Sequence, residues 1–478
     1  MDTNWVENEL RTVGLGDHRL NKRCAKILKS FADSPVSPIN QACDDWSETK
    51  AAYRFFQNDK VKYQEITKGH QQATTLRTEG LETILAVQDT TYFTYTNHPR
   101  TTGLCPLSRN RGKHKKEIPT LGLIMHSTLA VDCNGIPLGV CNQKIYSRPQ
   151  LSEEKKKLKK RTHNVALPIK EKDSYKWIEA LEQTVKTFSK RSENVVTICD
   201  READMYDLFL RAKELNTNLL VRASQNRTVN KKSIYSEITG QKLWSLLKKK
   251  DVMGVVTIEV PKKDTIPAHE AKCQITYCDF VLNRPKNHFE KHTKDLPDLK
   301  LYAVYIHEIP KGNNSDAIDW MLLTTLPVTS IELALEKMQW YCMRWRIETW
   351  HKILKSGLRV EDCRLSTSKR LIRYLSIMSI VAWRIFWITL ISRVEPESSC
   401  YLFLNDLEWK VLYRKFNKGS KLPKNEPTIN QCVRWIGQLG GFLARKKDKE
   451  PGIIYMWRGI KYFNAMVDAI IDAKEIYG

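Results

Sequence analysis

Acidic residues are scarce relative to basic ones in this chain of 478 residues. Its 54 Asp and Glu residues face 78 Lys and Arg residues, which gives a formal net charge of +24 at pH 7. A surplus of that size favours a polyanionic partner, with nucleic acid first and an anionic membrane surface second. No internal repeat is visible, which argues against a repeat architecture. The length allows two to four domains around one large core.

Three further absences narrow the class of protein. The twelve cysteines contain no C-x-x-C pair, and Cys273 and Cys278, the nearest to a ligand pair, have no second pair. This argues against a zinc site or a disulfide framework. The polar start, MDTNWVENEL, does not resemble a secretory signal. The longest apolar run, residues 375–392, contains Arg384, so we expect a buried core helix rather than a membrane span. We therefore expect a cytoplasmic protein with reduced thiols.

Residues 1–80 have the pattern of a helical domain. The segment RTVGLGDHRLNKRCAKILKSFAD places apolar residues at helical spacing, with cations between them that include Arg19, Lys22 and Arg23. It is either a DNA-binding head or an ordinary basic helix surface. The segment SETKAAYRFFQND predicts a further helix with Ser47 as its N-cap.

The next part of the chain favours strands. Residues 82–96, ETILAVQDTTYFTYT, are rich in β-branched and aromatic side chains and predict a strand. Residues 121–148 predict a hairpin that turns at Asn134-Gly135. Two basic stretches, 108–116 and 153–164, are expected to be loops, and only their charge suggests contact with DNA.

Strands and helices then alternate. NVVTICD (194–200) predicts a buried strand that runs directly into a helix, and TNLLVRAS (217–224) predicts another strand. Residues 225–300 are more polar and predict a β-rich insertion. From about residue 393 the chain is expected to be helical again.

The stretch YCMRWRIETWHKILK (341–355) sets a single acid, Glu348, among cations. On an uninterrupted helix the polar members share one stripe. They are Tyr341, Arg344, Glu348, Lys352 and Lys355. The stripe is either a solvated face, supported by Glu–Lys contacts at a spacing of four, or a functional surface.

Two more acids are placed where strands end. Asp89 lies in the first predicted strand of the mixed region, and Asp200 closes the strand NVVTICD. Functional groups of α/β sheets collect at strand ends. Together with Glu348 from a later helix, these carboxylates form an oxygen-only set that suits Mg²⁺ or Mn²⁺. Two such ions support phosphoryl transfer, and the cations of the stripe would hold backbone phosphates.

The same stretch is similar to the Tyr-x₂-Arg-x₃-Glu-x₆-Lys signature of the insertion-sequence-four group of DDE transposases. Its four positions are occupied by Tyr341, Arg344, Glu348 and Lys355. AVQDTT around Asp89 and CDREADMY around Asp200 resemble the motifs of the first two catalytic aspartates of that group. LGDHRLNKR, AYRF, LVRAS, DWMLLTT and QLGGF extend a likeness to the transposon-five type over nearly the whole chain, in the same order.

This resemblance implies an α/β fold with a ribonuclease-H-like mixed-sheet catalytic core between helical N- and C-terminal domains. The N-terminal domain, 1–80, would bind transposon ends. The catalytic domain, 81–392, would contain the β-rich insertion, about 225–300. The C-terminal domain, 393–478, would mediate dimerisation.

The resemblance also implies an activity. Asp89, Asp200 and Glu348 would hold two Mg²⁺ or Mn²⁺ ions. A homodimer would pair two transposon ends of double-stranded DNA, cut both strands through a hairpin and join the ends to target DNA. Trp320 would stack on a flipped base, and Arg222 would touch the DNA near the cut. Without the resemblance, Trp320 is a core aromatic and Arg222 a surface arginine.

Other classes of function compete with this one. A ribonuclease-H-like nuclease would use the same carboxylates without strand transfer. A DNA-binding regulator of transposition would have lost catalysis, but this chain keeps all three acids and residues 1–80. A membrane-surface protein is a more distant alternative, because the cations lie between strands rather than along one amphipathic helix. We expect a nucleoid-associated bacterial enzyme.

Overall fold

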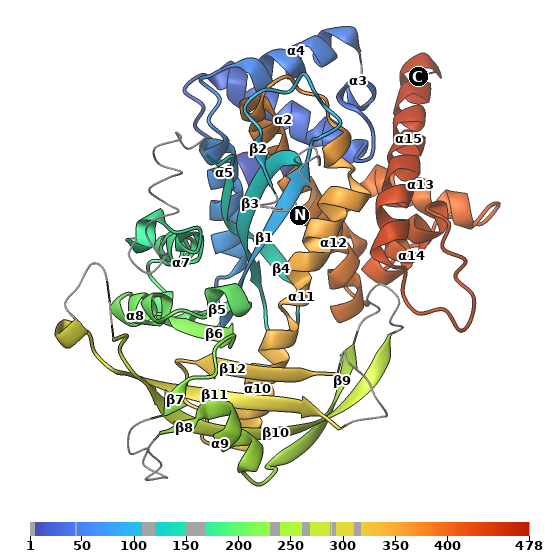
Figure 1. Cartoon of the computed structure of the whole chain (residues 1–478). Helices are drawn as coiled ribbons and strands as arrows, with labels where there is room; N and C mark the ends of the chain where they lie inside the picture. The colour runs from blue at the N-terminus through green and yellow to red at the C-terminus, as the bar shows by residue number, and fades with distance from the viewer. Residues whose placement is uncertain are drawn as a thin grey trace. The chain divides into compact units, whose positions relative to one another are not determined.

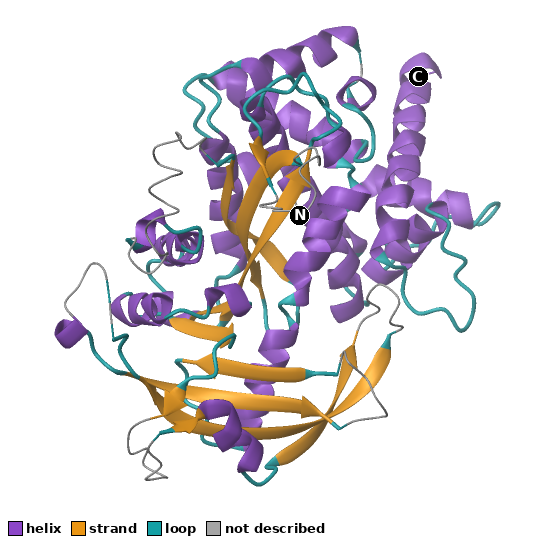
Figure 2. Cartoon of the chain, in the orientation of Figure 1, coloured by secondary structure: helices purple, strands orange, loops and turns teal. Residues whose placement is uncertain are grey.

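The computed structural model describes residues 5–43, 45–107, 120–148, 168–229, 240–260, 268–286, 288, 293–309 and 317–477. The chain divides into two compact units, whose elements are shown in Figures 1 and 2. The first unit comprises Met1–Leu81, Thr90–Gln150 and Arg346–Gly478, and the second comprises Glu82–Asp89 and Leu151–Trp345. The basic stretches 108–116 and 153–164 lie outside the described residues.

The first unit begins with five helices. Their bounds are α1 (Trp5–Leu10), α2 (His18–Asp33), α3 (Ile39–Ala42), α4 (Trp46–Gln57) and α5 (Tyr63–Arg77). The N-cap of α4 is Asp45, whose side chain accepts a hydrogen bond from the backbone N–H of Glu48. The prediction of Ser47 was therefore wrong by two residues. A carboxylate at this position caps the free N–H groups and also complements the helix dipole.

The predicted hairpin is confirmed. Strand β3 (Leu121–Val131) pairs antiparallel with β4 (Pro137–Tyr146), and β3 also pairs with β2 (Cys105–Pro106). Gly135 adopts a positive φ of 87° in the turn. Asp132 Oδ1 accepts hydrogen bonds from the backbone N–H groups of Asn134 and Ile136, at 3.0 and 2.7 Å. The side chain of Asp132 thus closes the turn that the Asn-Gly pair begins.

The long apolar run forms α12 (Ser368–Val394), the core helix of the first unit. By length and composition it is the one described helix that could cross a membrane, but 89% of its most apolar window is buried inside the molecule. It packs against α5 and β4, among other elements. Two buried tryptophans fix its register: Trp383 Nε1 donates to Pro137 O at 2.8 Å, and Trp350 Nε1 donates to Ser379 O at 3.2 Å.

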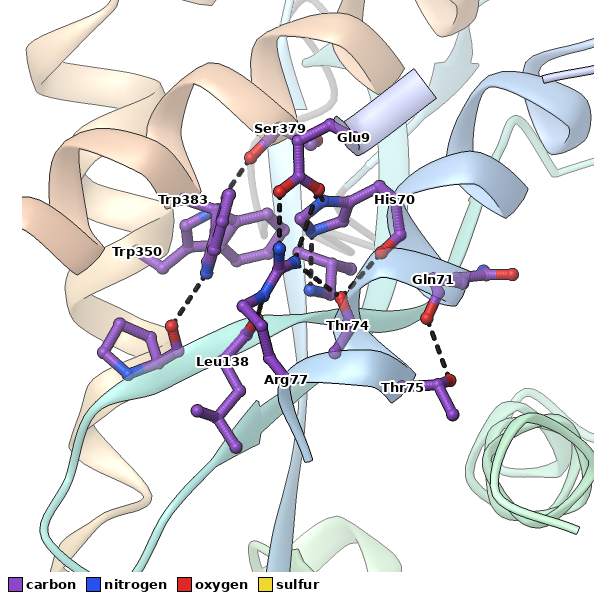
Figure 3. Close-up of polar contacts among 12 residues, drawn as sticks. Glu9, His70, Gln71, Thr74, Thr75, Arg77, Leu138, Trp350, Ser379 and Trp383 are labelled. Carbon is purple, nitrogen blue, oxygen red and sulfur yellow. Dashed lines mark hydrogen bonds and ion pairs between the residues drawn. The ribbon is translucent and has the colours of Figure 1, made fainter. Parts of the chain in front are cut away.

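A buried polar network ties α1, α5 and β4 together beside Trp383 (Figure 3). The N–H of Val140 donates to His70 Nε2 at 2.9 Å, so the proton of the neutral ring lies on Nδ1 and faces Glu9 Oε2 at 2.5 Å. Arg77 Nη1 donates to Glu9 Oε1 at 2.5 Å, and Arg77 also lies over the Trp383 ring. Burial lowers the pKa of His70. Burial alone would raise the pKa of Glu9, but His70 and Arg77 outweigh it and lower that pKa.

The rest of the first unit is helical, as predicted from residue 393 onward. Its helices are α13 (Asp406–Phe416), α14 (Ile429–Leu439) and α15 (Ile453–Tyr477), with short 3₁₀ turns at Val360–Asp362 and Cys400–Leu402. Both α13 and α14 begin with a capping box, from Asn405 and Thr428 respectively. These reciprocal caps satisfy N–H groups that a helix start leaves without partners.

The second unit is built on a large mixed sheet, which confirms the predicted α/β class. Its strand order is β1-β5-β6-β12-β11-β10-β9. The pairs β1–β5 and β5–β6 are parallel, and the remaining pairs are antiparallel. The bounds are β1 (Ile84–Thr94), β5 (Val195–Cys199), β6 (Asn218–Arg222), β9 (Gly254–Val260), β10 (His269–Leu282), β11 (Leu299–Glu308) and β12 (Asp319–Thr324). β1 begins in this unit and ends in the first.

Helices α7 (Tyr175–Thr187) and α8 (Tyr206–Glu214) pack with β5 and β6 through a common apolar core. The predicted insertion, 225–300, is indeed rich in strands. Its described part holds the two-stranded sheet β7 (Thr228–Val229) and β8 (Gln241–Lys242), helix α9 (Leu243–Lys249), and β9 and β10. β9 and β10 extend the main sheet, so the insertion adds to the core rather than forming a separate layer.

The stretch 341–355 is not one uninterrupted helix, and that prediction was wrong. Helix α10 (Ile331–Cys342) ends in a tight turn, where Arg344 N donates to Tyr341 O at 3.0 Å. Helix α11 (Trp345–Lys352) follows, and a π-helix continues it over Ile353–Gly357. Each irregularity changes the angle between successive side chains, so a projection at 100° per residue fails across it.

Candidate active site and DNA-binding surfaces

Asp89 and Asp200 lie side by side on neighbouring parallel strands of the second unit. The register of β1 against β5 runs from Ile84 opposite Val195 to Val87 opposite Ile198. Continued for two residues, past the end of β5 at Cys199, this register brings Asp89 level with Asp200. Burial raises the pKa of the Cys199 thiol, and the charges of Asp200 and Asp89 raise it further, so both carboxylates lie close to that side chain.

The position of Asp200 follows from the way its strand ends. It caps the short 3₁₀ turn Arg201–Ala203, and its Oδ1 accepts a hydrogen bond from the N–H of Glu202 at 2.8 Å. Burial raises the pKa of Asp200, and the Glu202 carboxylate adds to that effect. The backbone N–H, Arg344 and Lys176 offset only part of it. The hydrogen bond and the positive charges near Asp200 therefore do not fully offset the cost of burying its negative charge.

Two neighbouring carboxylates fit a divalent cation, since hard oxygen ligands and negative charge are what Mg²⁺ and Mn²⁺ bind. Within the part of the chain that the structure describes, no group of three or more His, Cys, Asp or Glu side chains stands ready to hold a metal. The third predicted ligand, Glu348, is exposed on α11 and belongs to the first unit. The structure brings Asp89 and Asp200 together, whereas the role of Glu348 as a third ligand stays a prediction.

Tyr341 is only 3% exposed, so its predicted place on a polar stripe was wrong. Its ring packs edge to face on Trp320, with centroids 5.2 Å apart. The guanidinium of Arg344 lies 5.9 Å from the centre of the Tyr341 ring. Tyr341, near the end of α10, is therefore a buried aromatic residue, and the half-buried Arg344 lies at the edge of its ring. Lys352 is exposed and Lys355 is half-buried, and both residues belong to the first unit.

Trp320 and Arg222 lie together on adjacent strands β12 and β6. The Arg222 guanidinium is 6.0 Å from the centre of the Trp320 ring, and its Nη2 donates to Asp319 O at 3.2 Å. Burial lowers the pKa of Arg222. Trp320 is 6% exposed and also packs edge to face on Trp345. In the protein without DNA, Trp320 is therefore packed as a core aromatic residue. Its stacking on a flipped base stays a prediction for the complex with DNA.

The candidate DNA contacts of α2 differ from one another. Arg19 has a side chain that is 91% exposed, and Lys22 is also exposed. Arg23 is half-buried and forms an ion pair with Glu48 of α4, which Lys26 also contacts at 3.1 Å. Arg23 therefore joins two helices of the N-terminal domain, a role that sequence spacing did not indicate.

Sequence reasoning missed a face of α4. Trp46 is 75% exposed and Tyr53 42% exposed, and the exposed cations Lys50 and Arg54 lie beside them. Spacings of four, seven and eight residues put these side chains on one side of the helix. An exposed aromatic face with cations is unusual on a protein in water and typical of a nucleic-acid contact. The pattern W-x₃-K-x₂-YR in the sequence was the available signal.

The chain matches three family models in succession. Residues 2–61 match the transposase DNA-binding family, residues 159–383 the transposase DDE domain, and residues 380–477 the transposase Tn5 dimerisation domain. Their succession supports a DNA partner, a homodimer and a metal-dependent enzyme that cleaves and transfers DNA strands. It also disfavours a nuclease without strand transfer. The chain belongs to the DDE transposases of the Tn5 type.

Proposed function

We propose that this transposase works by cut and paste: it binds inverted-repeat ends, cleaves both strands through a hairpin and joins the ends to target DNA. The observation that supports the proposal is the β1–β5 register, which, continued two residues past the last paired residues, brings Asp89 of β1 level with Asp200 after the end of β5. A half-buried carboxylate pair of this kind suits strand cleavage by phosphoryl transfer.

In the proposed site, Asp89, Asp200 and Glu348 would hold two Mg²⁺ or Mn²⁺ ions. When bound, such ions would supply Lewis-acid activation of the attacking water or 3′-hydroxyl and charge stabilisation for the leaving oxygen. Asp89 and Asp200 are held by strand pairing, so they need little reorganisation when DNA arrives. Arg344, Lys352 and Lys355 bind phosphates beside the cut. Tyr341, packed under Arg344, limits the directions in which that guanidinium can point.

Trp320 and Arg222 serve the hairpin step. Unpairing a base costs a few kcal/mol, and an aromatic platform returns about 1–3 kcal/mol per stacked base. For Trp320 to act in this way, its packing on Tyr341 and Trp345 must open when the end is bound. Arg222, already over the Trp320 ring, would hold the phosphate next to the flipped nucleotide.

The N-terminal domain, 1–80, supplies the contacts to the transposon end. Its contact surface is the exposed side of α4 together with Arg19 and Lys22 of α2, while Arg23 holds α4 in place through Glu48. The C-terminal domain, 393–478, pairs two subunits so that two ends are processed together. The enzyme acts on the bacterial nucleoid in the cytoplasm.

The test uses a labelled transposon-end duplex and Mg²⁺. Asp89→Ala, Asp200→Ala and Glu348→Ala should each abolish nicking and leave the gel-shift affinity for the end nearly unchanged, because phosphate contacts set that affinity. Glu171→Ala, which removes an exposed acid of the second unit, is the matched control and should nick normally. Near-normal nicking by one of the three mutants would remove that residue from the site. Nicking without hairpin or joined product from the wild type would favour a nuclease.

A further inference from the structure

Asp204 is a second buried acid in the segment that carries Asp200, and the proposed chemistry gives it no part. Its side chain has no exposed surface. It follows directly after the 3₁₀ turn Arg201–Ala203 that Asp200 begins. A carboxylate is costly to bury unless its oxygens are bonded and its charge is paired. The partners of Asp204 therefore show what its burial achieves.

Those partners all lie on the loop that follows β6. Asp204 Oδ2 accepts hydrogen bonds from the backbone N–H groups of Ser224 and Gln225, at 2.7 and 3.0 Å. Arg227 Nη1 donates to the same oxygen at 2.9 Å, and Arg227 Nη2 lies 2.5 Å from Oδ1. Arg227 also donates to the backbone carbonyl of Asp204. Asp204 thus binds three residues of that loop, Ser224, Gln225 and Arg227, and fixes the path of the chain between them.

The loop begins immediately after Arg222. Ala223, the next residue, donates its N–H to Met321 O of β12 at 2.7 Å, beside Trp320. The chain is therefore fixed on both sides of the β6 end: by β12 through Ala223, and by Asp204 through Ser224 and Gln225. At its other end Asp204 is joined to Asp200 through a single 3₁₀ turn.

We propose that Asp204 and Arg227 form a positioning pair that sets Asp200 and Arg222 in a fixed relation to each other. Asp204 is not a catalytic residue in this proposal, since it is buried and touches no reacting atom. It acts through the turn that presents Asp200 and through the loop that fixes Arg222. The proposal rests on the proposed roles of these two residues. A buried ion pair adds little net stability compared with apolar packing, and a fixed geometry is a recognised reason for such a pair.

The experiment compares thermal stability, end binding, nicking and the ratio of hairpin to nick across a small set of full-length variants. Asp204→Asn leaves Arg227 buried without its charge partner, so both melting temperature and nicking rate should fall. The double variant Asp204→Asn with Arg227→Met removes both charges and should recover most of the melting temperature. It should not recover nicking, which we expect to stay at least tenfold below wild type. The hairpin-to-nick ratio should fall further, because Arg222 serves that step.

Arg227→Lys is the mild variant for the case in which the others fold poorly. It keeps the charge but loses the two-nitrogen contact, so we expect a melting temperature near wild type and nicking several-fold slower. The matched control is Glu182→Gln, which breaks the 2.7 Å ion pair between Glu182 and Arg211 on α7 and α8 and should leave the rate unchanged.

A nicking rate that follows melting temperature through all the variants, with a constant hairpin-to-nick ratio, would show that the pair is structural and overturn the proposal. So would wild-type kinetics in Arg227→Lys. Failure of the underlying roles gives a different result: Asp200→Ala would still nick, or Arg222→Ala would still form hairpins, whatever the Asp204 variants do.

Discussion

Glu9 in the first unit and Asp200 in the second are both carboxylates withdrawn from water, but the fold treats them in opposite ways. Glu9 receives His70 and Arg77 at bonding distance, and its pKa is lowered. Asp200 receives one backbone N–H, with Arg344 and Lys176 acting from further away, and its pKa is raised. Glu9 is neutralised inside the protein, whereas Asp200 keeps an electrostatic deficit that a cation from solution can fill. This contrast separates a structural acid from a reactive one.

The largest effect expected from the contrast between Glu9 and Asp200 is on the free energy of unfolding. Glu9→Ala should lower the free energy of unfolding by about 3–5 kcal/mol, because it leaves Arg77 without its buried partner. Asp200→Asn should leave that free energy unchanged or slightly higher without metal, since it removes a poorly compensated charge. Urea denaturation of both variants measures the difference. Equal losses in the two variants would show that Asp200 is also a structural acid.

Acidification should weaken the first unit. Burial lowers the pKa of His70, and it lowers the pKa of His351 to about 3. The unfolded chain takes up protons at these histidines near pH 6.5 and the folded chain does not, so stability falls as pH drops below about 6.5. Well below pH 6.5, His351, whose pKa in the folded chain is about 3, contributes a slope of about 1.4 kcal/mol per pH unit, and His70 adds to it in the same direction. The raised pKa of Asp200 works in the opposite direction.

Unfolding midpoints in urea between pH 7.5 and 5 measure this slope, with His351→Gln as the variant that should reduce it. A wild-type midpoint that does not change over this range would contradict the prediction.

Trp320→Ala separates the two interpretations of a buried aromatic. As a base platform, Trp320 should matter only after the first nick, so nicked DNA should accumulate while hairpin formation slows. The lost stacking is about 1–3 kcal/mol. A pre-nicked end without the flipped base should partly rescue the variant. As a core aromatic, Trp320 should instead cost about 3–5 kcal/mol of stability, and nick and hairpin should fall together without rescue.

The smallest effects concern α4. Trp46→Ala should weaken end binding by about 1–3 kcal/mol without changing its salt dependence, because stacking releases no counterions. Lys50→Gln should lower the slope of log K against log salt by about one, as expected for one phosphate contact. Gel shifts over a range of salt measure both, and Tyr462→Ala, an exposed aromatic on α15, is the control. Wild-type binding by Trp46→Ala would exclude this face of α4.

What could be predicted from the sequence was local. Asp200 was placed at the end of its strand from a β-branched run and an abrupt polar stop, and Asn134-Gly135 marked a turn because few residues adopt its backbone angles. The prediction that Asp89 also ends a strand was wrong, because β1 continues to Thr94. The missed features depend on partners distant in the chain. Arg23 is occupied by Glu48, 25 residues away, and Tyr341 is buried under Trp320. No spacing rule contains such contacts.

The π-helix at Ile353–Gly357 carries a historical implication. A π-turn contains about one residue more than an α-turn, as if a single residue had been inserted into a regular helix. Deleting Ser356 would remove that extra residue, so the chain could close an ordinary α-turn and the later side chains would keep nearly the same direction relative to Lys355. Gly357 would then stay on Trp457, on which it packs so closely that a Cβ would come within 2.8 Å of the ring. In a family alignment, a gap at this position should therefore be compatible with an unchanged Gly357 and an unchanged Trp457.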